Sequence, residues 1–105
     1  MHALIEARRP AIETLCRRFH VQKLEVFGSA ARGQDFDPAR SDADFLVTFA
    51  PEAERSFATL FDLQQALEDL LGLSVDLVER PAIEQSRNYI RRRHILDGAE
   101  PLYVA

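Results

Sequence analysis

SDADFLVTF, residues 41–49, is the stretch that decides the fold of this chain. Apolar and polar side chains alternate within it, which is the period of a β-strand with two different faces. The face expected to pack against helices carries Ala43, Phe45, Val47 and Phe49. The opposite face carries Asp42, Asp44, Leu46 and Thr48. Asp42 and Asp44 therefore project from the same side of a strand over 42–49, about 7 Å apart along the chain.

Carboxylates held this close repel each other, and the repulsion is relieved when they share a cation. Oxygen ligands favour a hard cation such as Mg²⁺, which takes waters and substrate phosphates as its remaining ligands. A third carboxylate, Asp76, lies in another strand-like run, Ser74-Val75-Asp76-Leu77-Val78. An exposed sheet face could carry Asp42 and Asp44 without any ligand, so the pair alone leaves a purely structural explanation open.

A glycine–serine turn precedes these carboxylates. Gly28-Ser29 follows the apolar run 24–27 and stands thirteen residues before Asp42. Backbone N–H groups in such a turn can hold phosphate oxygens, and the Ser29 hydroxyl can add a bond. Arg32 could neutralise a phosphate, although a solvated loop arginine explains it equally well. A phosphate-binding turn beside a divalent-cation site points to phosphoryl or nucleotidyl transfer.

The composition is that of one ordinary domain, expected over residues 1–105. The formal net charge of −4 argues against non-specific binding to a nucleic-acid backbone. Cys16 is the only cysteine, which excludes an internal disulfide and favours a reducing compartment. No apolar run reaches the roughly 18 residues of a membrane span, and no secretory signal is recognisable. We therefore expect a soluble cytoplasmic protein.

The remaining periodicities predict helices that alternate with strands. Helices are expected over 4–19 with a kink near Pro10, over 57–71 and over 82–97. Strands are expected over 24–28, 42–49 and 74–79, with a terminal extended piece at 102–104. Loops are expected over 29–40, after a short helical turn, and around Pro51 and Arg55. This order predicts an α/β fold of the two-layer α+β kind, a mixed sheet with helices packed mainly on one face.

These residues also resemble a known family. Gly28-Ser29-Ala30-Ala31-Arg32-Gly33, followed by Ser41-Asp42-Ala43-Asp44-Phe45-Leu46-Val47, is similar to the minimal nucleotidyltransferase (MNT) proteins of the DNA-polymerase-β-like superfamily. The resemblance covers nearly the whole chain, with Ala43 in place of a bulkier apolar residue as a small departure. It implies that Gly28 and Ser29 bind phosphate. It also implies that Asp42, Asp44 and Asp76 are catalytic metal ligands for two Mg²⁺ ions, with ATP as substrate.

The same resemblance implies a partner. Such MNT proteins are similar to antitoxins that are paired with a helical ribonuclease of the HEPN type (higher eukaryotes and prokaryotes nucleotide-binding). Transfer of AMP from ATP to a tyrosine hydroxyl of that toxin would silence it. Two alternatives stay open: a catalytically silent antitoxin that inhibits by binding alone, and an enzyme that modifies a small-molecule hydroxyl. The size of the chain favours a protein acceptor, because it leaves no room for a template-binding or tRNA-binding domain.

Three weaker signals lie outside this pattern. Arginines at 87 and 91–93, near Tyr89 and His94, could meet an acidic partner or the nucleotide, but a solvated helix face explains them more simply. Phe57 and Phe61 are most simply core residues, with partner binding as the alternative. Tyr103 is expected to pack against the fold, although a terminal tyrosine could also be a site of self-modification.

Overall fold

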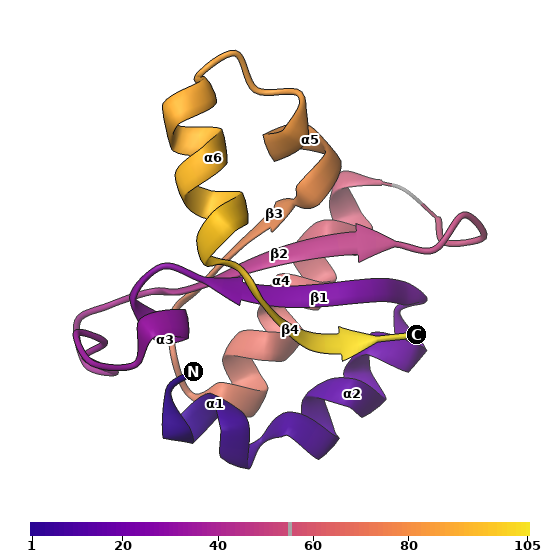
Figure 1. Ribbon diagram of the computed structural model, residues 1–105. Coiled ribbons are helices and arrows are strands. Elements are labelled where there is room, and N and C mark those ends of the chain that lie inside the picture. Colours follow the sequence, from indigo (N-terminus) through magenta and orange to yellow (C-terminus); the bar gives the residue numbers. More distant parts are fainter. Residues whose placement is uncertain (55) are drawn as a thin grey trace.

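The computed structural model describes residues 1–54 and 56–105, and a four-stranded sheet forms its centre (Figure 1). In the spatial order β3-β2-β1-β4, the strands are Val75–Glu79, Ala43–Phe49, Val21–Phe27 and Glu100–Val104. β1 pairs antiparallel with both β2 and β4, whereas β2 pairs parallel with β3. The predicted mixed sheet is therefore confirmed.

The strand boundaries differ from the predicted ones in ways that matter for the site. β1 begins at Val21 and ends at Phe27, so that Gly28 lies just beyond the strand. β2 begins at Ala43 and leaves Asp42 just ahead of it. The expected extended piece at the end of the chain is longer, a fourth strand, because its backbone pairs with the free edge of β1. Arg55, predicted to lie in a loop, is outside the described residues.

Three helices form the main layer on one face of the sheet: α1 (Ala3–Ala7), α2 (Arg9–Arg18) and α4 (Phe57–Leu71) (Figure 1). The predicted kink in the first helix is a break at Arg8, because Pro10 is tolerated in the first turn of a helix and not in its interior. The predicted bounds of α4 are confirmed. Ser56 accepts a hydrogen bond from the Thr59 N–H at 3.1 Å, and Gly72 ends the helix in a left-handed conformation.

The main core lies between this helical layer and the sheet. The predicted apolar face of β2 is confirmed, since its four residues Ala43, Phe45, Val47 and Phe49 are all buried there. They share the core with Ile12 and Cys16 of α2 and with Leu63 and Leu67 of α4. Burial raises the pKa of the Cys16 thiol to about 12, so this cysteine is a packing residue and not a nucleophile.

Phe57 and Phe61 lie outside this core, and their prediction as core residues is wrong. They are 87% and 53% exposed on the first turns of α4. The buried residues of α4 are Leu63, Leu67 and Leu71, which follow one another at a spacing of four. The two phenylalanines stand beside that stripe, because positions 57 and 61 are rotated away from it around the helix.

A smaller pair of helices, α5 (Arg80–Glu84) and α6 (Tyr89–Gly98), covers part of the other face of the sheet (Figure 1). The prediction of one helix over 82–97 is therefore wrong. The side chains of Ser86 and Asn88 accept hydrogen bonds from the backbone N–H groups of Asn88 and Arg91. Such local bonds compete with helical ones, which explains why the chain leaves one helix after Glu84 and starts another at Tyr89.

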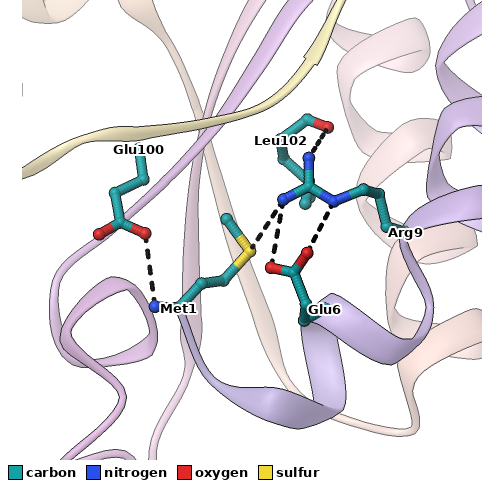
Figure 2. Close-up of polar contacts among 5 residues, drawn as sticks. All are labelled: Met1, Glu6, Arg9, Glu100 and Leu102. Atoms are coloured by element: carbon teal, nitrogen blue, oxygen red, sulfur yellow. Dashed lines mark hydrogen bonds and ion pairs between the residues drawn. The ribbon is translucent and has the colours of Figure 1, made fainter.

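Polar contacts fasten the edge strand β4 to the N-terminal helices (Figure 2). The Arg9 guanidinium donates to the Leu102 carbonyl oxygen at 3.0 Å and also pairs with Glu6 at 3.0 Å. The Met1 amino group lies 3.4 Å from the Glu100 carboxylate. Within the part of the chain that the structure describes, none of the helices has the length and hydropathy needed to cross a membrane.

A buried ion pair holds α5 on the sheet. Glu25 of β1 is only 3% exposed, and both of its carboxylate oxygens accept from Nη1 of Arg80 at 2.7 Å. The Lys23 ammonium lies 3.7 Å from the same carboxylate. Because α5 leads into α6, this pair fixes where the second helical layer starts.

We expect Arg80→Met to destabilise the fold by about 3 kcal/mol, because among the described residues the buried Glu25 carboxylate would keep only Lys23 as a partner. Urea unfolding at neutral pH measures this loss. Arg93→Met is the matched control: it breaks an exposed pair with Asp97 at 3.5 Å, which is worth less than about 0.5 kcal/mol. Equal effects of the two substitutions would contradict a structural role of the Glu25–Arg80 pair.

Candidate active site

A cleft of about 1140 Å³ lies between the second face of the sheet and α6. Gly28, Asp44 and Asp76 line it from the sheet side, and Tyr89, Arg91 and His94 line it from α6. Phe27 and Val78 lie in the cleft wall and also pack with Leu46, Ile83 and Ile95 in a small second core. The cleft therefore rests on a packed apolar floor, with carboxylates along one side.

Asp44 and Asp76 are the two carboxylates that the structure brings together. They face each other in the register of the parallel pair β2–β3, so their side chains project from the same face of adjacent strands. Burial, followed by the negative charges of Asp76 and Asp42, raises the pKa of Asp44 to about 6. A nearby cation would therefore stabilise the ionised form of the Asp44 carboxyl group.

Asp42 lies differently from the other two aspartates. It precedes β2, is exposed, and is not among the residues that line the cleft. Its charge nevertheless contributes to the raised pKa of Asp44. Across residues 1–54 and 56–105, no three His, Cys, Asp or Glu side chains are gathered closely enough to hold a metal ion. The structure thus joins Asp44 with Asp76 and leaves Asp42 at the margin.

Gly28 connects β1 to α3 (Ser29–Arg32) and packs directly on Asp44. Its φ of 68° and ψ of −149° lie in a region that is essentially open only to glycine. A Cβ atom at this position would come within 2.7 Å of the Asp44 Oδ2 atom. The sequence motif therefore has a steric cause, because only a residue without a side chain lets the turn lie this close to the carboxylate.

Ser29 and Arg32 also line the cleft, at the two ends of α3. The first N–H groups of a helix have no partner within the helix, which leaves those near Ser29 available to an oxygen ligand. Arg32 donates to both Asp35 oxygens, at 3.3 and 2.8 Å, and this pairing raises the pKa of Arg32. The Arg32 guanidinium thus pairs with Asp35 at the edge of the cleft and would have to leave this pair to bind a phosphate.

The α6 side of the cleft carries the arginines and His94 for which the sequence left two explanations, a solvated helix face and a patch that meets the nucleotide or an acidic partner. Arg91, Arg93 and His94 are exposed, as the first explanation predicts, and they also line the cleft, as the second requires. Tyr89 and Ile90, 61% and 68% exposed, add an apolar surface at its start. The clustering of arginines beside Tyr89 was the available signal. A basic wall therefore faces the carboxylates of the sheet.

Opposed carboxylates on adjacent strands, beside a glycine turn at one end of a mixed sheet, define the arrangement expected of a nucleotidyltransferase. Residues 9–97 match the family described as "Nucleotidyltransferase domain". The chain belongs to this family, and the family predicted from the sequence is confirmed.

Relatives with assigned names agree with this placement. A Methanocaldococcus jannaschii protein assigned as a protein adenylyltransferase is 36% identical over 78 residues, 74% of each chain. The protein adenylyltransferase MntA of Thermococcus cleftensis is 41% identical over 70 residues, 67% of each chain.

Solved structures share the fold. A structure assigned as a minimal nucleotidyltransferase is 36% identical, with a TM-score of 0.71 over 92% of this chain and 91% of the other. A complex of a tri-AMPylated Shewanella oneidensis HEPN toxin with an MNT antitoxin contains a similar chain, with a TM-score of 0.64 at 19% identity. That match covers 96% of this chain and 73% of the other. The second likeness concerns the fold alone.

Proposed function

We propose that this chain transfers AMP from ATP to a tyrosine hydroxyl of a HEPN-type toxin and so acts as the antitoxin of the pair. The observation that carries the proposal is the placement of Asp44 opposite Asp76, directly beside the Gly28-Ser29 turn, in a cleft of a nucleotidyltransferase fold. The acceptor is inferred from the protein adenylyltransferases among the relatives and from the HEPN toxin complex that shares the fold. Because the proposed reaction consumes ATP and uses Mg²⁺, we expect it to take place in the cytoplasm.

We infer that two Mg²⁺ ions bind at the sheet end of the cleft, where Asp44 and Asp76 lie opposite each other. The donors at the sheet end are carboxylate oxygens, which Mg²⁺ prefers. Burial, and after it the charges of Asp76 and Asp42, raise the pKa of Asp44, and a bound cation would offset both effects. Asp44 and Asp76 would hold the ions, and Asp42 would join them from the exposed margin of the site. Bound ions of this kind neutralise the triphosphate charge and lower the pKa of an attacking hydroxyl.

The chain's own groups supply the remaining chemistry. Gly28 keeps the turn free of a side chain, so that phosphate oxygens can approach the backbone N–H groups near Ser29. The Ser29 hydroxyl can donate to the same oxygens. Arg91 and Arg93 on α6 offset the charge of the phosphate tail. Asp76, exposed toward the cleft, accepts the proton that the tyrosine hydroxyl loses on attack.

The test is to incubate the protein with the product of its chromosomal neighbour, ATP labelled at the α-phosphate and Mg²⁺. Label is expected on a tyrosine of the neighbour, together with loss of its ribonuclease activity. Asp42→Asn/Asp44→Asn should lose both effects, whereas Asp62→Asn, an exposed aspartate of α4, should keep them. Protection without label that survives the double substitution would instead establish an antitoxin that acts by binding alone.

A further inference from the structure

One of the two tyrosines of this chain lies inside its own candidate active site. Tyr89 is the first residue of α6, is 61% exposed and lines the cleft that also holds Asp44 and Asp76. Tyr103 is half-buried in β4 and packs against the main core, on the other face of the sheet. Tyr89 is therefore the tyrosine that lines the same cleft as the two carboxylates.

The surroundings of Tyr89 suit a phosphodiester. Arg91 and Arg93 line the same cleft, so the negative charge of a phosphate attached to Tyr89 would lie near two guanidinium groups. Within residues 1–54 and 56–105, Arg93 has only a long, exposed contact with Asp97 at 3.5 Å, which leaves its guanidinium available. Among the residues that the structure describes, the Tyr89 hydroxyl is engaged in none of the hydrogen bonds found.

We propose that Tyr89 is a site of self-adenylylation, modified by the active site of the same molecule. This inference rests on the proposed function, since it uses the same transfer of AMP with a different tyrosine as acceptor. The Tyr89 oxygen attacks the α-phosphorus of ATP and forms a new O–P bond, while the bond from that phosphorus to the pyrophosphate oxygen breaks. The phenolic proton passes to a carboxylate of the cleft and then to water, and pyrophosphate leaves.

The modification would place an AMP group in the cleft that has to admit ATP. A molecule modified at Tyr89 would therefore be hindered in binding a second nucleotide. Self-adenylylation would then limit turnover when no partner protein offers its own tyrosine. This consequence follows from the position of Tyr89 within the cleft and needs no second site.

The experiment incubates the purified chain alone with Mg²⁺ and ATP labelled at either the α- or the γ-phosphate. Label is expected from the α-phosphate only. Trypsin separates the two tyrosines, since Tyr89 falls in the peptide 88–91 and Tyr103 in the peptide 94–105. Mass spectrometry should find one AMP on the peptide 88–91. Tyr89→Phe should remove the label, the matched variant Tyr103→Phe should keep it, and unchanged thermal midpoints would establish that both variants fold.

Two further measurements make the proposal specific. The fraction of labelled chain at a given time should not change when the protein is diluted, because the reaction is intramolecular; a fraction that falls on dilution would overturn modification within one molecule. Asp44→Asn should abolish the label. Label that persists in Asp44→Asn or in Tyr89→Phe, or that maps to another residue, would overturn the assignment of Tyr89.

The two proposals fail in different ways. If the wild-type chain labels its partner and not itself, self-adenylylation is wrong and the proposed function stands. If it labels neither itself nor the partner, the transferase proposal is wrong, and the inference about Tyr89 falls with it.

Discussion

Asp44→Asn is expected to lower nucleotide transfer by about 10³-fold, or roughly 4 kcal/mol of transition-state stabilisation. We expect so large an effect because Asp44 lies opposite Asp76 in the β2–β3 register and next to the Gly28 turn. Removing its charge takes away one of the two carboxylates that the structure brings together in the cleft. Single-turnover transfer to the partner, measured at saturating ATP and Mg²⁺, is the direct readout.

The same substitution is expected to stabilise the metal-free fold. The pKa of Asp44 is about 6 in the folded protein and 3.8 as its ordinary value, so the folded state binds the proton more tightly than the unfolded chain does. The free energy of unfolding therefore falls as pH rises from 3.8 to 6, and the full penalty of the ionised group persists above that range. The pKa difference sets an upper limit of about 3 kcal/mol. Partial exposure of the group reduces the expected gain for Asp44→Asn to roughly 1–2 kcal/mol at pH 7.

Urea unfolding in the presence of a chelator measures this gain, which should shrink as the pH is lowered toward 4. Added Mg²⁺ should raise the thermal midpoint of the wild type, because an ion that binds only the folded state stabilises it. The shift should be small in Asp44→Asn and intact in Asp62→Asn. An equal Mg²⁺ response of all three proteins would contradict an ion at Asp44.

Local patterns in the sequence were sufficient to predict the strands and the turn that meet at this cleft. Alternation along 42–49 fixed the faces of β2, and the glycine turn and Asp76 each stand at a strand that short-range patterns identify. The register that sets Asp76 beside Asp44, and not beside another residue of β2, depends on long-range pairing. That register could be inferred only through the resemblance to a family.

Tertiary context accounts for what was mispredicted. The apolar spacing over 82–97 predicted one helix, but hydrogen bonds from Ser86 and Asn88 outweigh that periodicity over a few residues. Arg91 and Arg93 of α6 are exposed, as the sequence indicated, but nothing in their spacing reveals that they also line a cleft opposite the sheet. Phe57 and Phe61 were assigned to the core by residue type, whereas their rotation around α4 leaves them exposed.

Gly28→Ala should cost both stability and activity, since the new methyl group meets the Asp44 Oδ2 atom at 2.7 Å in a backbone conformation that disfavours alanine. We expect a loss of about 2–4 kcal/mol in the free energy of unfolding. Transfer should fall by about 10²-fold, because Asp44 and the phosphate-binding turn are both displaced.

Gly72→Ala is the matched control. Gly72 has a φ of 67° and a ψ of 30°, and a Cβ atom there would meet no atom of the described residues within 4 Å. Gly72→Ala should lower the free energy of unfolding by about 1 kcal/mol, the cost of an alanine in the left-handed conformation alone. It should leave transfer unchanged. An equal loss of stability in the two variants would mean that the contact between position 28 and Asp44 has no energetic weight.

A double-substitution cycle separates the two parts of the Gly28 effect. In an Asp44→Ala background the oxygen that the methyl group would meet is gone, so Gly28→Ala should then cost only its backbone term. The two substitutions should therefore be non-additive in the free energy of unfolding by about 1–2 kcal/mol, as is typical of residues in contact. If the two substitutions are additive, the whole loss of stability in Gly28→Ala comes from its backbone conformation. The close approach of the turn to the carboxylate would then no longer explain why glycine occupies this position.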